Sequence, residues 1–446
     1  MKKISFTRLG KQGVKDGWQA VNISPDAPPE LIGRYAALQN ANTPPAPVFE
    51  PEDSVEQTIT ELQTDNHYVY LTKIKYGLAD EQGRPSMFAD SFVCDIKRLT
   101  ESPDKVLRLL KKSNFRFEIG DSPESHLSEA ADCELAPSEI EDSAFFPSLL
   151  KCVYSVCCEQ RAAKEPLHII CDCSDKTIAS VMCCLYRALL LPLRKSLMFT
   201  TYEKGSHKTI VFSRRIAQVE SDSCNLARRR YFDLSTGETN MPESTLKKLS
   251  TYGFIDDIAN SPKAATLDYF KSFEDALREY GCGEVTNLNL YKFVYDMNRI
   301  DDILRGDNAE LLKKLNELLS ISLPNRKALD EQILRLFTTA LERNIEPNDV
   351  LISKLASASS ASHNKTLICL CAVCVYTRAL ACAGDSFTDF FDGASEMTFE
   401  IYEEPPEYEF PDDDFSDDDD EYEEERFAKP AHPIKNLIKK FTHKKP

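Results

Sequence analysis

The chain has 446 residues, a formal net charge of −18, and 42% hydrophobic residues. This length allows roughly two to four domains, and the apolar content is sufficient for real hydrophobic cores. The acidic balance argues against nucleic acid as the main partner, because phosphate contacts require a dense Lys/Arg surface.

The N-terminal segment and the cysteines indicate the compartment. The first residues, MKKISFTRLG, have no apolar stretch behind the two lysines, which predicts that there is no signal peptide. Many of the 15 cysteines lie in apolar runs, such as Cys157-Cys158 and Cys183-Cys184. We therefore expect reduced cysteines that act as small hydrophobic residues, and a cytoplasmic protein.

The first part of the chain is predicted to be an N-terminal α/β domain, residues 1–116. A Gly-rich turn between the first two strands indicates a hairpin, and Asp65-Asn66 is the expected turn of a second pair of strands. Strands are expected at 4–9, 18–23, 55–62, 67–76 and 88–96, and helices at 28–39 and 103–111.

A second α/β domain is predicted at residues 145–243, after an acidic segment at 117–144 that has no clear pattern and is expected to be a loop. A strand, a helix and a strand follow one another in this region, which indicates a crossover and a partly parallel sheet. The expected helices are 147–161 and 176–190, the second ended by Pro192, and the expected strands are 167–171, 197–202 and 208–213, the last pairing after a turn at Gly205.

An all-α domain is predicted at residues 244–384, because apolar residues recur at spacings of three and four. The expected helices are 265–280, 288–305, 309–319, 326–343, 348–356 and an apolar helix at 366–383. The last contains Arg378, which would cost about 2.5–3.5 kcal/mol near the centre of a bilayer. We favour a buried helix over the alternative, a membrane span. The expected fold class is thus α/β with a mixed sheet, then an all-α domain, then a disordered tail.

The C-terminal tail, residues 385–446, separates its charges into an acidic block at 385–425 and a basic block at 426–446. Such a segment cannot bury enough apolar surface to offset its ordering entropy, which predicts disorder. Within the basic block, apolar residues at helical spacing lie beside lysines, which indicates an amphipathic helix that docks to a partner. The residues concerned are Ile434, Leu437, Ile438, Lys439, Lys440 and Phe441. The alternatives are contact with an anionic membrane surface, contact with the acidic block, and a solubilising tail without a contact.

No pattern for catalysis, metal binding or a cofactor stands out. The chain has no G-x-x-x-x-G-K-[ST] motif, so we expect no P-loop nucleotide site. Cys371-x-x-Cys374 lies in an apolar helix without a second ligand pair, which favours core cysteines over zinc ligands. His168 and Cys171 flank one strand at a spacing that points their side chains to opposite faces, which does not favour a nucleophile and its base.

Several short motifs together resemble a known family. Thr7-Arg8, Gly17-Trp18-Gln19, Pro29-Glu30, Gly83-Arg84-Pro85 leading to Phe88 and Ser91, and Phe199-Thr200-Thr201-Tyr202 resemble the N-terminal and middle domains of bacterial GTPase-associated proteins. The resemblance covers about residues 1–240. It implies a protein that acts beside a GTPase or other NTPase encoded nearby, in proposed bacterial conflict or defence systems. In relatives a histidine often stands where this chain has Asp90, so a role of that histidine is in doubt here.

Two functional hypotheses follow. The first is a non-catalytic adaptor or regulatory protein whose tail docks to a protein partner. The alternative is an enzyme with an unrecognised site around Arg84, Asp90 and Thr200. The polar residues that could form a site in the α/β part are Arg8, Trp18, Arg84, Asp90, Thr200 and Tyr202. A membrane-associated protein is a third reading, through the 366–383 helix or the basic block.

Overall fold

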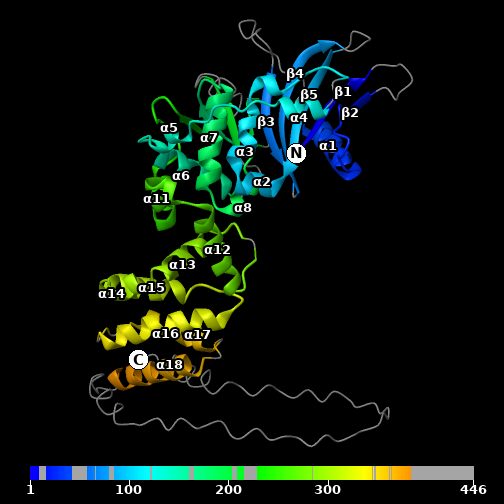
Figure 1. The fold of residues 1–446 in the computed structure, drawn as a ribbon. Helices are drawn as coiled ribbons and strands as arrows, with labels where there is room; N and C mark the ends of the chain where they lie inside the picture. Colours follow the sequence, from blue (N-terminus) through cyan, green and yellow to red (C-terminus); the bar gives the residue numbers. More distant parts are fainter. Residues whose placement is uncertain are drawn as a thin grey trace, which may run out of the picture. The chain divides into compact units, whose positions relative to one another are not determined.

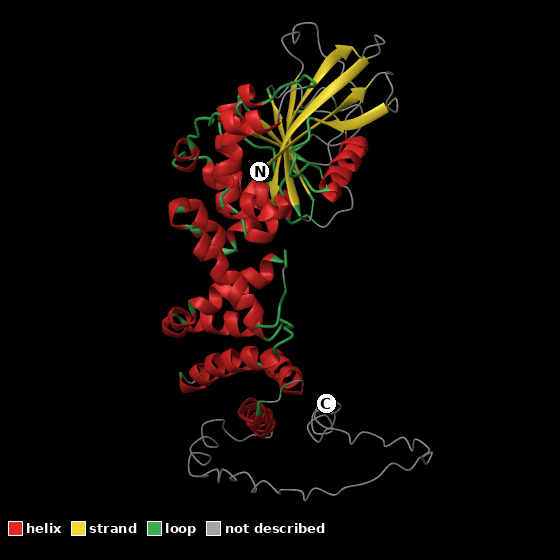
Figure 2. Ribbon diagram, turned by 45° about the vertical axis from the view of Figure 1, so that its right-hand side comes forward, coloured by secondary structure: helices red, strands yellow, loops and turns green. Residues whose placement is uncertain are grey.

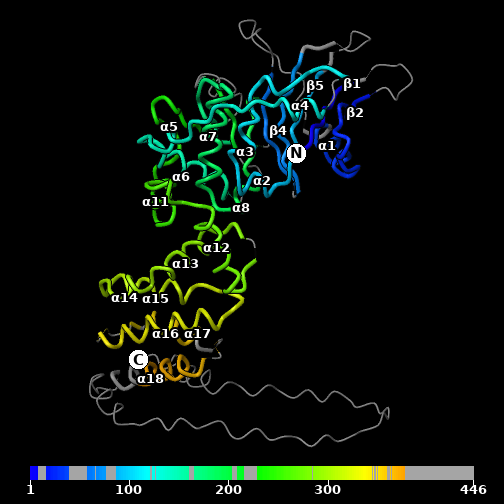
Figure 3. Tube along the Cα trace, in the orientation of Figure 1, coloured from blue at the N-terminus to red at the C-terminus, as the bar shows by residue number. Residues whose placement is uncertain are grey.

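The computed structural model describes most of the first 382 residues of the chain (Figure 1). The described residues, coloured along the trace in Figure 3, are 1–9, 17–42, 58–65, 67–79, 85–120, 123–159, 165–202, 208–214, 229–283, 285–343, 345, 348–360, 362 and 364–382. They fall into two compact units, which we describe separately. The α/β unit comprises Met1–Arg278 and Gly283–Asn298, and the helical unit comprises Glu279–Cys282 and the chain from Arg299 onward. The expected tail lies outside the described residues.

The α/β unit is built on one nine-stranded mixed sheet of order β2-β1-β5-β4-β3-β7-β8-β6-β9. The strands are β1 (Lys2–Leu9), β2 (Gly17–Val21), β3 (Thr58–Thr64), β4 (Tyr68–Ala79), β5 (Pro85–Asp95), β6 (Leu167–Ile170), β7 (Phe199–Thr200), β8 (Ile210–Ser213) and β9 (Tyr231–Asp233). Neighbours from β2 to β7 in this order pair antiparallel, whereas β7, β8, β6 and β9 pair parallel.

The two α/β regions expected as separate domains thus share a single sheet. They meet where β3 pairs with β7 through Glu61 opposite Thr200 and Leu62 opposite Phe199. The expected turn between β3 and β4 is confirmed at Asp65, whose side chain accepts the backbone N–H groups of His67 and Tyr68 at 2.7 and 2.6 Å. This is the local hydrogen bonding that favours Asp in turns.

Helix α1 (Pro29–Asn42) covers one face of the antiparallel half of the sheet (Figures 1 and 2). Its Leu31 and Tyr35 are buried against Ile4 and Phe6 of β1, and the Tyr35 hydroxyl lies 2.7 Å from the hydroxyl of Ser91 on β5. We call this the α1 face. Strand alternation assigns each strand residue to the α1 face or to the opposite face.

The opposite face carries a group of mostly short helices (Figure 2). They are α2 (Ile96–Glu101), α3 (Pro103–Leu107), η2 (Arg108–Leu110), η3 (Lys112–Asn114), α4 (Pro123–Glu129), α5 (Pro137–Glu141), α6 (Phe146–Cys157), α7 (Asp175–Ala188) and α8 (Leu191–Ser196). Arg194 of α8 is buried and donates to the carbonyl oxygens of Leu189, Thr100 and Arg187 at 2.6–2.9 Å. Burial lowers the pKa of Arg194 to about 10, and these carbonyls satisfy the guanidinium.

The α/β unit ends with a further run of helices: α10 (Glu243–Ser250), α11 (Gly253–Asn260), η4 (Pro262–Ala264), α12 (Leu267–Glu279) and α13 (Leu288–Asn298). An aromatic cluster holds these helices to α6. The ring of Phe254 on α11 lies 6.3 Å from that of Tyr154 on α6, 5.9 Å from that of Phe273 on α12 and 6.4 Å from that of Tyr291 on α13.

Two expectations about local structure were wrong. The segment 117–144 is not a plain loop, because it contains α4 and α5, each with a proline in its first turn. Pro192 does not end the long helix, which stops at Ala188; it lies in the first turn of α8, where its missing N–H is tolerated. The expected pairing of the strand at 208–213 is confirmed, because β8 pairs with β7, in parallel; the expected turn at Gly205 lies outside the described residues.

The helical unit confirms the all-α part of the predicted fold class. It contains α14 (Ile300–Arg305), α15 (Asn308–Leu318), α16 (Arg326–Glu342), α17 (Asp349–Ser360) and α18 (Lys365–Cys382). Consecutive helices pack through residues at helical spacing, such as Leu311 and Leu315 of α15 and Ile333 and Phe337 of α16, which are all almost fully buried.

Helix α18 has one buried face. Leu367, Cys371 and Cys374 are at most 2% exposed, whereas Cys369 is exposed and Tyr376 is 49% exposed. The helix expected at 366–383 therefore buries one face and exposes another. Cys371 and Cys374 are core cysteines, as expected. Within the described residues, no helix combines the length and apolarity that crossing a bilayer requires.

Candidate functional site

The structure separates the polar residues that the sequence grouped as a candidate site. Arg8 and Trp18 are cross-strand partners on β1 and β2, and Trp18 stacks on Phe6, which places both on the α1 face. Thr200 opposes Glu61 on the same face. Three strands separate β1 from β7, so Arg8 and Thr200 are about 19 Å apart across the sheet.

Tyr202 and Asp90 also lie apart from one another. Tyr202 follows β7 and packs against the core beneath α1, and its backbone N–H donates to the Thr200 hydroxyl at 3.0 Å. Asp90 of β5 lies on the opposite face. Arg84 lies outside the described residues, as do the six tail residues Ile434, Leu437, Ile438, Lys439, Lys440 and Phe441. The described members of the group therefore do not form one constellation.

Asp90 belongs to a buried charge cluster instead. Its carboxylate pairs with the Lys3 ammonium and accepts the Ser5 hydroxyl and the Arg116 backbone N–H, each at 2.9 Å. Lys3 and Asp90 are each 1% exposed. Burial lowers the pKa of Lys3 against the opposing attraction of Asp90.

A second buried lysine lies on the same face. The Lys73 ammonium pairs with Asp175, the first residue of α7, at 2.5 Å, and burial lowers the pKa of Lys73 as well. The other Asp175 oxygen accepts the backbone N–H of Lys112 at 2.8 Å. The Lys73–Asp175 pair joins β4 to α7. The Lys3–Asp90 pair lies within the sheet and reaches the helical layer through the Lys3 ammonium, which donates to the Asn114 carbonyl at 3.1 Å.

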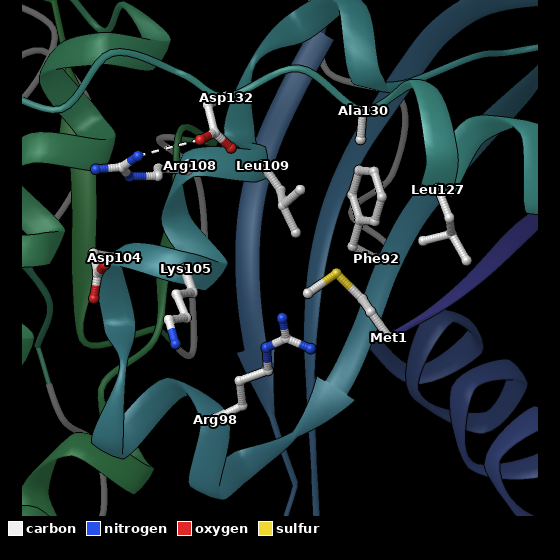
Figure 4. A pocket seen from close by; sticks show the side chains of 10 residues that line it. All are labelled: Met1, Phe92, Arg98, Asp104, Lys105, Arg108, Leu109, Leu127, Ala130 and Asp132. Carbon is white, nitrogen blue, oxygen red and sulfur yellow. Dashed lines mark hydrogen bonds and ion pairs between the residues drawn. The ribbon is translucent and has the colours of Figure 1, made fainter.

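Beside this cluster lies an open pocket with a volume of about 610 Å³ (Figure 4). Ten residues from β5, α2, α3, η2, α4 and the adjoining chain line it. They are Met1, Phe92, Arg98, Asp104, Lys105, Arg108, Leu109, Leu127, Ala130 and Asp132. Phe92, Leu109 and Leu127 supply apolar surface, and the Lys3 ammonium lies 4.1 Å from the centre of the Phe92 ring, a cation–π contact that fixes the ring.

The charged side chains of the pocket differ in whether they form an ion pair. Arg108 pairs with Asp132 at 3.2 Å. Within the described part of the chain, neither the Arg98 guanidinium nor the Lys105 ammonium has a hydrogen-bond or ion-pair partner, and both side chains are exposed. Figure 4 shows Arg98 directed toward the space between Met1 and Lys105. The pocket therefore offers two unpaired cations beside an apolar floor.

The pocket is lined by charged and apolar side chains. The ten lining residues include no histidine, cysteine, serine or threonine that could act as a nucleophile or base. One of the two carboxylates, Asp132, is already held by Arg108. Among the residues that the structure describes, no group of three or more His, Cys, Asp or Glu side chains is arranged to hold a metal ion.

The pocket was not predicted from the sequence. Its residues come from separate elements between Met1 and Asp132, and the segment that supplies Leu127, Ala130 and Asp132 was expected to be a loop. The only local signal was Pro123-Glu124, a typical helix start. Comparisons with family models, with curated proteins and with solved structures found no match for this chain.

Proposed function

We propose that this chain is a non-catalytic adaptor or regulatory interaction protein, and that the pocket between α2, α3 and α4 receives an acidic, partly apolar segment of a protein partner. The observation that supports this most directly is the pair of unpartnered cations, Arg98 and Lys105, beside the apolar surface of Phe92, Leu109 and Leu127. Apolar anchors supply most of the affinity of such contacts, and rim charges supply selectivity and association rate.

The partner class follows from the charges and the size. A carboxylate on the incoming segment would replace water around Arg98 and Lys105 without separating an existing ion pair. A volume of about 610 Å³ accommodates one or two side chains and their backbone, as ligand pockets of this size do. The enzyme alternative around Arg84, Asp90 and Thr200 has less support, because Asp90 and Thr200 lie on opposite faces of the sheet and the Asp90 carboxylate is fully engaged.

The test is binding of the full-length chain to fluorescent peptides in which Asp or Glu residues flank a Leu or Phe. Replacing Arg98 and Lys105 together with alanine should weaken binding by about 1–2 kcal/mol, or roughly five- to thirty-fold, the value of two exposed ion pairs. The matched control is Lys97→Ala with Lys248→Ala, which removes two exposed positive charges outside the pocket. Equal affinities for the two double variants would refute the assignment.

The resemblance to bacterial GTPase-associated proteins suggests that the partner is a cytoplasmic GTPase or other NTPase encoded nearby. In this proposal the basic block of the tail is a second contact, through Ile434, Leu437, Ile438 and Phe441 with Lys439 and Lys440. Purification from the native host of the full chain and of a chain that ends at Glu425 tests this point. An NTPase retained only by the full chain would support tail docking, and equal retention by both forms would contradict it.

A further inference from the structure

The loop between β6 and α7 brings two cysteines together. Cys171 and Cys173 follow the carboxyl end of β6, and their sulfur atoms lie 4.0 Å apart. The backbone N–H of Cys173 donates to the Cys171 sulfur at 3.3 Å. Both residues are partly exposed, whereas Cys152 and Cys183 are buried.

The backbone holds this arrangement in place. The Cys171 N–H donates to the Ser213 carbonyl of β8 at 2.9 Å, and Ser174 caps α7 by accepting the Thr177 N–H at 3.2 Å. Cys173 lies between these fixed points with φ = +54°, in the left-handed region that non-glycine residues seldom occupy. Such a conformation persists only where the surrounding structure imposes it, and it often marks a functional site.

The electrostatic surroundings distinguish Cys171 from the other cysteines. The contact with Cys173 lowers the pKa of the Cys171 thiol, although burial and the nearby Asp172 and Asp233 carboxylates oppose this effect. By contrast, burial raises the pKa of Cys152 and Cys183 to about 11. A thiol with a lowered pKa beside the first turn of a helix is typical of reactive cysteines.

We infer that Cys171 and Cys173 form a redox-active dithiol that exchanges with disulfides of small thiols or proteins. The Cys171 thiolate attacks one sulfur of the incoming disulfide, whose S–S bond breaks and releases one thiol. Cys173 then loses its proton, attacks the Cys171 sulfur of the mixed disulfide and releases the second thiol. The dithiol loses two electrons and two protons, and the incoming disulfide becomes two thiols. This inference does not depend on the proposed pocket.

The chain carries its own control for this spacing. Cys369 and Cys371 repeat the Cys-x-Cys pattern on α18, where residues two apart do not face each other. Cys369 is exposed, whereas Cys371 is 2% exposed. The same sequence spacing therefore produces a close sulfur pair only in the β6–α7 loop.

In the test, the full-length chain is treated with excess oxidised glutathione and the reaction is quenched with acid. The protein is then alkylated and digested for mass spectrometry. We expect the peptide with Cys171 and Cys173 to lose two hydrogens and to resist alkylation, whereas the peptide with Cys369 and Cys371 forms no internal disulfide. In Cys173→Ser, glutathione should remain bound at Cys171. In Cys171→Ser, the amount of glutathione bound at Cys173 should be at least tenfold lower than the amount bound at Cys171 in Cys173→Ser.

Two results would overturn the inference. One is a 171–173 peptide that stays reduced while Cys369 takes up glutathione. The other is equal glutathione on the two serine variants, which would mean that neither cysteine is the attacking group. Fluorescence of Trp18, the single tryptophan of the chain, reports whether each variant is folded, and the first result needs no variant at all.

Discussion

Replacing Asp90 with asparagine removes the negative charge that faces the Lys3 ammonium inside the α/β unit. Both residues are 1% exposed, so water cannot replace the lost partner. The asparagine side chain still occupies the space and still offers an oxygen to the Ser5 hydroxyl or the Arg116 N–H. The variant therefore isolates the charge from the shape of the side chain.

The size of the effect follows from the proton equilibrium of Lys3. Its ordinary pKa is 10.5, and burial already lowers this pKa in the folded protein. Without Asp90 the folded state can always relieve the charge by releasing the proton. That release costs about 1.4 kcal/mol per pH unit below 10.5, or about 5 kcal/mol at pH 7 and about 2 kcal/mol at pH 9. Breaking a buried pair typically costs about 3–5 kcal/mol, which agrees with this limit.

The sign of the pH dependence is also fixed. Between the lowered folded pKa of Lys3 and its unfolded value of 10.5, the unfolded state binds more protons. Stability therefore rises with pH across this window. Loss of Asp90 lowers the folded pKa of Lys3 further and widens the window toward neutral pH. The stability deficit of Asp90→Asn should thus shrink from pH 7 to pH 9.

Urea unfolding followed by tryptophan fluorescence measures this deficit. The single tryptophan, Trp18, lies on β2 and stacks on Phe6 of β1. Lys3 lies on β1 as well, so the fluorescence reports on the part of the sheet that holds the ion pair. The matched control is Asp132→Asn, which breaks an exposed pair with Arg108 and should cost at most about 1 kcal/mol. Equal midpoints for the two variants, or an Asp90→Asn deficit that is the same at pH 7 and pH 9, would refute the reasoning.

Two further predictions concern local structure. Ser174→Ala removes the cap of α7 and should lower the stability of the α/β unit by about 1 kcal/mol, measured by the same urea unfolding, whereas Ser174→Asp should preserve it. Gly281→Ala should destabilise the protein by about 1–3 kcal/mol, because Gly281 has φ = +76° and an added Cβ would lie 3.0 Å from Cβ of Pro324. The control is Gly283→Ala, because an added Cβ at Gly283 meets nothing within 4 Å. Its unfolding temperature, measured by circular dichroism, should fall much less than that of Gly281→Ala, and an equal fall in both variants would contradict the steric argument.

The elements with a strong local pattern were predictable from the sequence. The strands around Ile74 and Val93 are rich in β-branched and aromatic residues, and the Asp65 turn follows from its side-chain chemistry. The long helices of the helical unit follow from apolar spacing. The short helices α4, α5 and α8 were missed, because a helix of five to seven residues shows little periodicity and depends on its tertiary contacts.

The candidate site was not predictable in the same way. Asp90 drew attention only because a histidine often stands at this position in the family that the chain resembles, and its partner Lys3 lies 87 positions away in the sequence. Arg98 and Lys105 look like ordinary surface cations in the sequence. Only the packing of α4 against the antiparallel half of the sheet shows that they border an apolar pocket. Tertiary contacts of this kind leave no local motif.

The narrow junction between β3 and β7 has a consequence for the order of assembly. Strands β3, β4 and β5 follow one another along the chain and pair as neighbours, so their contacts close short loops. The parallel pairs made by β6 join distant residues, such as Leu167 with Ile210 of β8 and His168 with Tyr231 of β9. Because local contacts form faster than distant ones, we expect the β3–β5 meander to nucleate folding. The pairing of Glu61 with Thr200 and of Leu62 with Phe199 then joins the half of the sheet that forms early to the half that forms late. Pulsed hydrogen exchange during refolding would show this order as earlier protection of the amides in β3, β4 and β5.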